Sequence, residues 1–257
     1  MNSKQLAQSL LCLLDNLSGR PFFLAIRRGL FIVLPLIMIG SFTLLLRNLP
    51  FEAAQNAVDA LLGPVGMRAC DTLVAGTFGI SALALACALG GASAMRANLT
   101  NPSAPAVSPM LSSLVVLSCF FVIVAPEETS SWTISFSMDR GLLLAMCVAM
   151  AGSAVFVRLA RYRIFHLSEE MAGHDPVVRD VVTVMPAAMA TILLFGFIRF
   201  LLTLWGATDL HAATSKLLTL PFQHSGNGLG FGLLYSFTSQ VLWFFGAHGP
   251  NVLNSVD

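Results

Sequence analysis

The sequence predicts an all-α polytopic membrane protein with about six transmembrane helices and the start of a re-entrant hairpin. Of its 257 residues, 56% are hydrophobic and only 11% are charged, whereas soluble domains carry about 25% charged residues. The mean hydropathy is +0.79, and apolar runs near the roughly 20 residues needed to cross a bilayer recur along the chain. A chain with so little charge cannot cover a water-facing surface, so we expect it to lie in a membrane.

Composition also excludes several classes of function. The net charge is +1, with no basic patch between aromatic residues, so nucleic acid is not an expected partner. The five cysteines form no CxxC pair and lie mostly in apolar runs, which predicts neither a disulfide framework nor a metal site. No Walker loop, GxSxG or HExxH motif occurs. We therefore expect no cofactor, and no catalysis from this chain alone.

Residues 1–28 are predicted to form a cytoplasmic amphipathic N-terminus. Leucines from Leu6 to Leu17 recur at helical spacing, as in a helix that lies on a membrane surface. The basic residues are spread over the whole segment, and no small-residue cleavage site follows a short apolar core. A secretory signal peptide is therefore not expected.

The apolar runs predict six spans, at residues 29–46, 72–95, 107–125, 141–157, 181–204 and 228–245. Pro35 and Pro186 do not exclude the first and fifth spans, because proline is tolerated in membrane helices. Pro186 has a second interpretation, as the true start of the fifth span. Residues 208–220, before the sixth span, are predicted to form a short surface helix.

The Lys and Arg residues predict a cytoplasmic N-terminus. With that orientation nine of the 14 basic residues are cytoplasmic and four are external, and Arg199 lies within the fifth span. The cytoplasmic set is Lys4, Arg20, Arg27, Arg28, Arg96, Arg158, Arg161, Arg163 and Arg179, and the external set is Arg47, Arg68, Arg140 and Lys216. Nine against four agrees with the positive-inside rule.

Two polar features leave alternatives open. The loop at residues 158–180 is either a plain cytoplasmic turn or a docking face for a soluble partner, and its His166 and His174 are expected to be ordinary loop histidines. Arg199 is either a functional charge in the membrane or a side chain that extends to the interface.

Two Gly-rich stretches flank the sixth span. Residues 218–232 contain Gln223 and Asn227, whose amides could pair with sugar hydroxyls, although a plain interfacial turn is the alternative. After the span, Gly246, His248 and Asn251 stand among helix breakers, as in the tip of a re-entrant hairpin of a transporter. Trp243 could stack on a sugar or anchor the interface.

The stretch "WFFGAHGPNVL" at residues 243–253 resembles the WFFG(I/V)HG signature of membrane-embedded enzyme IIC subunits. These belong to the lactose/cellobiose/diacetylchitobiose branch of the bacterial phosphotransferase system. Residues 22–46 resemble the first span of that family, and residues 220–246 resemble the lead-in to its first hairpin. The resemblance extends over essentially the whole chain.

The resemblance implies a homodimer that binds a sugar, expected to be a disaccharide, within membrane lipid. Residues 29–180 would form an N-terminal dimer-interface domain, and residues 181–257 a partial sugar-transport domain that ends in the first hairpin tip. The sugar would be carried inward by an elevator-like motion and phosphorylated on its 6-hydroxyl by a phosphorylated cytoplasmic enzyme IIB.

The same resemblance assigns expected roles to individual residues. His248 would contact the sugar near the reacting hydroxyl, which makes it the catalytic candidate, and Asn251 and Gly246 share its hairpin tip. Trp243 is a further sugar-binding candidate. Asn227, Gln223 and Arg96 are weaker candidates, from position and chemistry alone.

The chain also departs from the family pattern. Family members are usually longer and carry a second hairpin and a functional glutamate, whereas this sequence ends at Asp257 and has no glutamate in a predicted span. Three explanations stay open: a fragment of a longer permease, an enzyme IIC-like sensor module of a signalling protein such as a cyclic-di-GMP phosphodiesterase, or a truncated dimer scaffold that transports nothing. The sequence does not identify the sugar.

Overall fold

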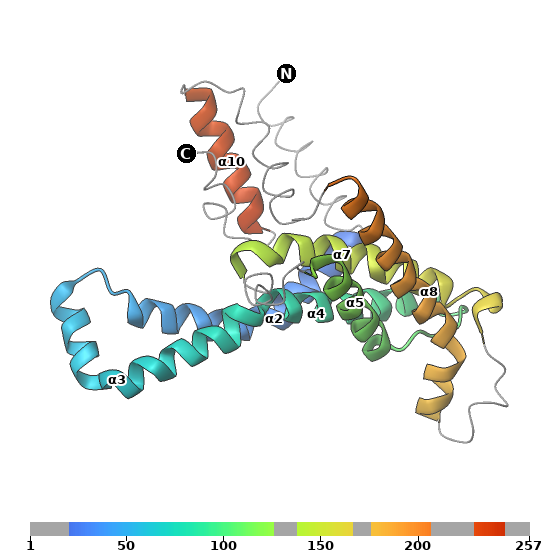
Figure 1. Cartoon of the computed structure of the whole chain (residues 1–257), viewed down its shortest axis with the longest axis horizontal. Coiled ribbons are helices and arrows are strands. Elements are labelled where there is room, and N and C mark those ends of the chain that lie inside the picture. The colour runs from blue at the N-terminus through green and yellow to red at the C-terminus, as the bar shows by residue number, and fades with distance from the viewer. Residues whose placement is uncertain (1–20, 126–137, 167–175, 207–228, 245–257) are drawn as a thin grey trace, which may run out of the picture.

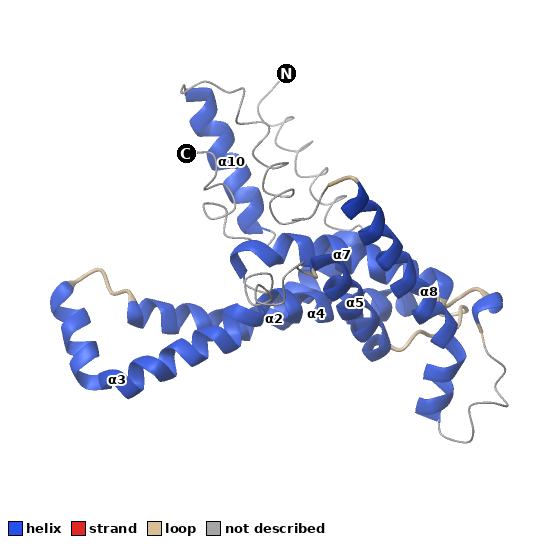
Figure 2. Ribbon diagram, in the orientation of Figure 1, coloured by secondary structure: helices blue, strands red, loops and turns tan. Residues whose placement is uncertain are grey.

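The structure, a computed structural model, describes residues 21–125, 138–166, 176–206 and 229–244, and every regular element in these ranges is a helix (Figures 1 and 2). The α-helices are α2 (Pro21–Arg47), α3 (Glu52–Thr77), α4 (Ser81–Thr100), α5 (Pro109–Val124), α7 (Met138–Leu159), α8 (Pro176–Leu204) and α10 (Leu229–Phe244), and the short 3₁₀ turns are η1 (Phe78–Ile80) and η3 (Arg163–Phe165). The predicted all-α class is confirmed.

Four helical stretches in the described residues are long and apolar enough to cross a membrane. They are α2 from Leu24, the continuous stretch Glu52–Thr100, α7 from Gly141, and α8 from Val178. The third and sixth predicted spans correspond to α5 and α10, which have 16 residues each. The described residues of all six predicted spans are therefore largely helical, and α5 is shorter than a usual bilayer crossing.

The second span is longer than the sequence suggested. We expected it to begin at residue 72, but α3 begins at Glu52, and the helical stretch runs on through η1 and α4 for 49 residues. At about 1.5 Å per residue that is roughly 70 Å, more than twice the hydrocarbon thickness of about 30 Å. Gly63, with a φ of 58°, followed by Pro64, kinks α3 near its middle. Figure 1 shows α3 folding back beside α2 there.

The fifth span corrects a second expectation. Pro186 does not start the helix, because α8 begins at Pro176 and Pro186 lies inside it. A proline is well tolerated at the first helical position, where its missing N–H would have no intrahelical partner. Inside a membrane helix, neighbouring helices can compensate for the lost hydrogen bond.

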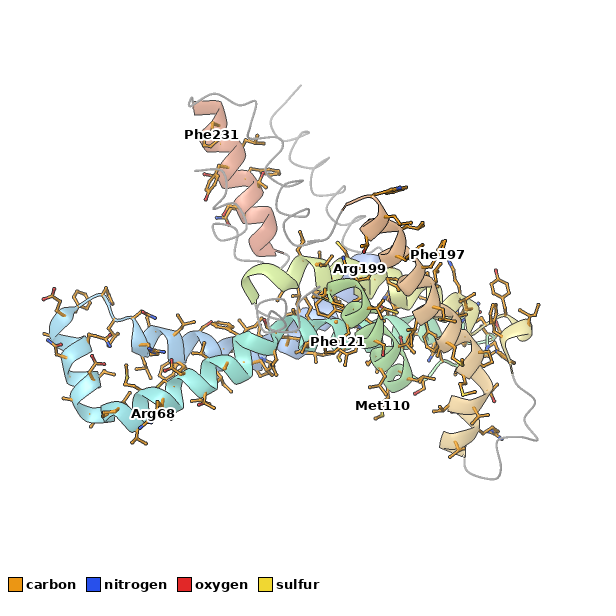
Figure 3. The ribbon with its side chains drawn as sticks, viewed as in Figure 1. Arg68, Met110, Phe121, Phe197, Arg199 and Phe231 are labelled. Atoms are coloured by element: carbon orange, nitrogen blue, oxygen red, sulfur yellow. The ribbon has the colours of Figure 1, made fainter. Side chains whose placement is uncertain are left out.

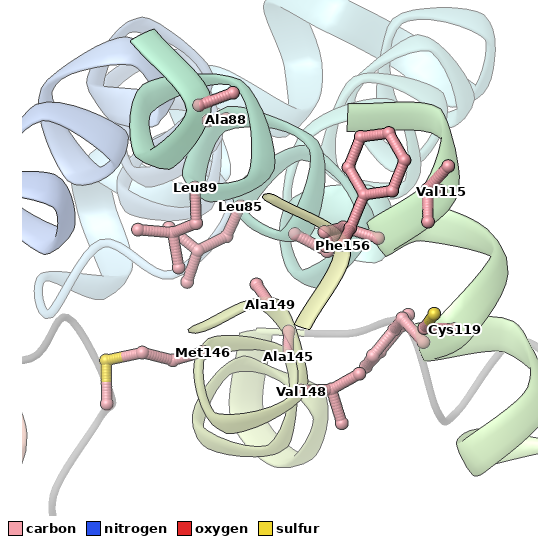
Figure 4. Packing of buried hydrophobic residues seen from close by; sticks show 14 of the residues in the cluster. Leu85, Ala88, Leu89, Val115, Cys119, Ala145, Met146, Val148, Ala149 and Phe156 are labelled. Atoms are coloured by element: carbon pink, nitrogen blue, oxygen red, sulfur yellow. The ribbon is translucent and has the colours of Figure 1, made fainter. Parts of the chain in front are cut away.

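The centre of the fold is the packing of α4 against α5 and α7, with α2 and α8 on either side (Figure 1). Leu85, Leu89 and Phe156 are fully buried in this cluster (Figure 4), and so is Phe120. Because α4 is rich in alanine and glycine, its neighbours can approach its backbone closely. This close packing fixes the positions of the helix ends.

The outer faces of the flanking helices are apolar as well. Phe31 and Phe42 on α2 are each 64% exposed, and Leu193 on α8 is 69% exposed. Phe197, labelled on α8 in Figure 3, is 57% exposed. Soluble monomers rarely expose such continuous apolar surface. These faces suit contact with lipid or with a second apolar protein surface.

Candidate functional site

The helix that leads to the proposed hairpin tip is described, and the tip is not. Helix α10 matches the sixth predicted span to within a residue at each end, and its Phe231 and Tyr235 rings stack with centroids 6.4 Å apart. Trp243 lies in the last turn of α10. Five of the predicted site residues lie outside the described residues: Gln223, Asn227, Gly246, His248 and Asn251. Their roles therefore stay predictions.

Arg96 is the one predicted site residue whose side chain is described, and it lies in a cavity of its own. The cavity has a volume of about 500 Å³ and lies between the ends of α4 and α7 and the beginning of α2. It is lined by Ala25, Ser93, Arg96, Ala97, Thr100, Met150, Ser153, Ala154, Val157, Arg158 and Arg161. The described lining residues come from α2, α4, α7 and Arg161, and the side chain of Trp243 lies outside the described residues.

Three arginines therefore meet in one cavity, which we call the arginine cavity. Arg161 donates from Nη2 to the Ala97 carbonyl oxygen at 2.7 Å, which ties the end of α7 to the end of α4. The Nε atoms of Arg96 and Arg161 are buried without a hydrogen-bond partner among the described residues. In the sequence, Arg158 and Arg161 served only as an orientation signal. The helix order already placed them at the same membrane face as Arg96, which is the signal that could have grouped them.

Hydrogen bonds between helices hold the end of α4 in place. The Asn98 side chain donates from Nδ2 to the Val107 carbonyl at 2.8 Å and accepts from the Val107 N–H at 3.0 Å through Oδ1. Both backbone groups of a residue just before α5 are thereby satisfied by one amide. Asn98 is two residues beyond Arg96, so this pairing fixes the turn of α4 that carries the arginine.

Arg199, the charge inside the fifth span, has a structural contact. It is half-buried, and its Nη2 donates to the Ala125 carbonyl oxygen, the residue after the end of α5, at 3.1 Å. The guanidinium therefore satisfies a carbonyl at a helix C-terminus and is favoured by the partial negative charge there. This contact explains how the charge is accommodated without assigning it a ligand.

The polar stretch after α7 is described only in part, and its histidine has an ordinary role there. The Nε2 atom of His166 lies 2.7 Å from the Ala160 carbonyl oxygen, so the ring caps the end of α7. Within the described ranges, no group of three or more His, Cys, Asp or Glu side chains could hold a metal ion.

A second cavity, of about 750 Å³, lies between α2, α4 and α5. Its lining is largely apolar, with Arg27 and Arg28 near the start of α2 and residues such as Cys87 and Gly91 on α4. This apolar groove is open to the same outer face that carries Phe31.

Together, the apolar outer faces, the helices of membrane length and the Gly-rich close packing define a polytopic α-helical membrane protein. More particularly, the chain is similar to enzyme IIC components of the phosphotransferase system. It is 25% identical to the lichenan permease IIC component of Bacillus subtilis over 259 residues, which is 98% of this chain and 56% of that protein. The earlier resemblance to enzyme IIC is confirmed.

Other relatives give the same result. The oligo-beta-mannoside-specific EIIC component of Bacillus subtilis is 25% identical, covering 98% of this chain and 56% of that protein. The cellobiose-specific EIIC component of Geobacillus stearothermophilus is 24% identical, covering 90% and 52%. The chain therefore spans about half the length of the curated relatives it matches. No family model matches it.

The fold agrees with the sequence relatives. The crystal structure of the transporter ChbC, the IIC component of the N,N'-diacetylchitobiose-specific phosphotransferase system, superposes with a TM-score of 0.70 at 20% identity. The match covers 98% of this chain and 59% of ChbC. The chain thus has the enzyme IIC fold over nearly all of its own length.

Proposed function

We propose that this chain is part of a sugar permease of the phosphotransferase system, an enzyme IIC. The observation that supports this most is the similarity along 98% of the chain to a named IIC component, together with the matching fold. The relatives' names mention lichenan, oligo-beta-mannoside and cellobiose. A disaccharide or short oligosaccharide is therefore the proposed substrate class.

The proposed sugar site is the hairpin tip that follows α10. The imidazole of His248 would hydrogen-bond the 6-hydroxyl of the sugar and orient its oxygen for in-line attack on phosphorus. The phosphoryl group would leave phosphorylated enzyme IIB, and the hydroxyl proton would pass to a base. Phosphoryl transfer depends mainly on such positioning. Asn251 and Gly246 would share the tip, with Trp243, Asn227 and Gln223 around the sugar.

The same proposal includes the assembly and its orientation. The chain would be a homodimer in a bacterial inner membrane with a cytoplasmic N-terminus, so that enzyme IIB meets the hairpin tip from inside. Residues 29–180 would form the interface domain and 181–257 the sugar domain. The exposed apolar face of α2 supports an interface with another apolar surface.

Two alternatives follow from the chain's coverage of about half of its relatives. As the membrane sensor of a signalling protein, it would bind sugar without moving it across the membrane. As a dimer scaffold, it would bind no sugar. Both alternatives keep the fold and differ only in what the hairpin tip does.

Calorimetry with the purified, detergent-solubilised chain tests the sugar site. The sugars are cellobiose, lactose and diacetylchitobiose, and the proteins are wild type, His248→Ala and His166→Ala. His166 caps α7 at Ala160, so it is a matched histidine outside the proposed site. We expect saturable binding of at least one sugar that is lost in His248→Ala and kept in His166→Ala.

Uptake into proteoliposomes then separates the three functions. Binding with sugar uptake in the presence of phosphorylated enzyme IIB supports the permease, and binding without uptake supports the sensor. A folded dimer that binds none of the sugars contradicts both and supports the scaffold.

A further inference from the structure

The arginine cavity contains more positive charge than its described surroundings compensate. Arg96, Arg158 and Arg161 all line it, and none of its described lining residues is acidic. The ion pair in the described residues joins Arg47, the last residue of α2, to Asp71 of α3, and neither of them lines the cavity. Three guanidinium groups repel one another, and partial exclusion of water strengthens that repulsion. An anion in the cavity would remove this cost.

Helix ends account for only part of the charge. The C-termini of α4 and α7 favour cations, and Arg161 uses Nη2 to satisfy the Ala97 carbonyl. The Nε groups of Arg96 and Arg161 are nevertheless buried with no hydrogen-bond acceptor among the described residues. A buried donor without an acceptor is costly. Both residues that carry these donors also line the cavity, so guanidinium groups that the described residues satisfy only in part stand at its wall.

The remaining lining suits a tetrahedral oxyanion. The Ser93 hydroxyl makes only a long contact of 3.9 Å with the sulfur of Met150, so it can turn to a stronger acceptor. Guanidinium groups match phosphate oxygens through pairs of parallel hydrogen bonds. The volume of about 500 Å³ lies within the range of roughly 300–1,000 Å³ typical of small-ligand sites. Basic pockets between membrane helices bind phosphorylated lipid headgroups.

We propose that the arginine cavity between α2, α4 and α7 is a binding site for a phosphate group, held by Arg96, Arg158 and Arg161. The phosphate belongs either to the headgroup of an anionic phospholipid or to a soluble phosphate. It is proposed as a site separate from the sugar site, and its described lining comes from α2, α4, α7 and Arg161. Arg96 is thereby reassigned from a sugar contact to a phosphate contact.

Thermal unfolding of the full chain in neutral detergent, with and without inorganic phosphate, tests the soluble source. Sodium chloride of equal ionic strength corrects for screening. We expect phosphate to raise the unfolding temperature of wild type, and Arg96→Gln to weaken the apparent phosphate affinity roughly tenfold or more, since hydrogen bonds to charged groups are strong. Arg96→Lys should bind phosphate more tightly than Arg96→Gln and less tightly than wild type. Lysine keeps the positive charge but lacks the paired N–H donors of the guanidinium group.

Two further variants keep the test decisive if Arg96→Gln does not fold. Arg158 is exposed, so Arg158→Gln should leave the packing intact and still weaken phosphate binding. Arg179 is an exposed arginine at the start of α8 and does not line the cavity, so Arg179→Gln should bind phosphate like wild type. Equal weakening by Arg158→Gln and Arg179→Gln would mean a general charge effect and would overturn the proposal.

Native mass spectrometry tests the lipid source, with the chain released from nanodiscs of phosphatidylglycerol or of phosphatidylcholine. Retention of phosphatidylglycerol that is lost in Arg158→Gln and kept in Arg179→Gln supports the site with a lipid headgroup as its ligand. If phosphate raises the unfolding temperature in detergent and no lipid is retained, the site is supported with a soluble phosphate as its ligand. If wild type shows neither a phosphate shift nor retained phosphatidylglycerol, the proposal is overturned. Water would then be the acceptor for the buried Nε groups. No sugar is used, so the outcome is independent of the sugar site.

Discussion

The Ser112 hydroxyl donates a hydrogen bond of 2.9 Å to the Gly90 carbonyl oxygen, and this bond joins α5 to α4 in the middle of the core. Ser112 is fully buried. The next residue of α5, Ser113, makes a similar bond of 2.8 Å from Oγ to the carbonyl of Cys87, three residues before Gly90 on α4. Backbones can come this close only where one helix carries small residues. The pair at 90 and 112 therefore sets the distance between the two helices.

Gly90→Ala should destabilise the fold because there is no room for a methyl group. A Cβ at residue 90 would lie 3.0 Å from Val116 Cβ and 3.1 Å from the Ser112 carbonyl oxygen, and one of these neighbours is backbone. Overpacking of this kind costs about 1–3 kcal/mol. We expect a fall of roughly 2–10 °C in the thermal unfolding temperature in detergent.

The matched control for that change is Gly196→Ala on α8. A Cβ at residue 196 would meet nothing within 4 Å, and alanine favours helix over glycine. This variant should unfold at the same temperature as wild type or a higher one. If both alanine variants lower the unfolding temperature equally, tight packing at Gly90 is not the cause.

Ser112→Ala removes the interhelical hydrogen bond without adding volume. The Gly90 carbonyl keeps its intrahelical partner, so the loss should be small, about 0.5–1.5 kcal/mol. The control is Ser118→Ala on the same helix, whose exposed hydroxyl bonds only to the Leu114 carbonyl of its own helix. The thermal unfolding temperature should fall in Ser112→Ala and not in Ser118→Ala. An equal fall in Ser118→Ala would contradict the interhelical assignment.

Asn98→Asp tests the amide that pairs with both backbone groups of Val107. A carboxylate can accept from the Val107 N–H but would face the Val107 carbonyl without a proton to donate. We expect about 1–3 kcal/mol of destabilisation, the usual effect of a lost partner in a partly buried pair. The measurement is thermal unfolding, with limited proteolysis between α4 and α5 as a second readout.

The control for the amide is Asn48→Asp. Its exposed side chain donates only to the Leu44 carbonyl of its own helix end. It should change the unfolding temperature little. Comparable loss in the two variants would mean that added negative charge, and not the Val107 pairing, destabilises the protein.

The helices themselves were predictable from the sequence because apolar runs of membrane length leave few alternatives. The sixth span was placed to within a residue at each end, at α10. The start of α3 was missed because Glu52, Asp59 and Asp71 looked like an external loop, yet polar residues are compatible with a helix beyond the hydrocarbon. Pro186 was ambiguous because its effect depends on the helices packed around it.

The candidate site was less accessible to sequence reasoning. The motif at residues 243–253 led to the enzyme IIC family, but its hairpin tip lies outside the described residues. Arg96 was singled out for its chemistry and assigned to the sugar. Only packing shows that it shares a cavity with Arg158 and Arg161, more than 60 residues away in the chain. Such groupings depend on helix rotation, which hydropathy does not determine.

Arg199→Gln distinguishes the two interpretations of the charge in the fifth span. The contact of 3.1 Å with the Ala125 carbonyl predicts a stability role, because a charged donor at a helix end contributes about 1.5–3 kcal/mol. We expect the unfolding temperature to fall by roughly 3–12 °C. Arg199→Lys keeps the charge and should recover part of the loss. At a temperature low enough to keep the Arg199→Gln variant folded, its sugar affinity should equal that of wild type. Lost sugar affinity with unchanged stability would instead make Arg199 a functional charge.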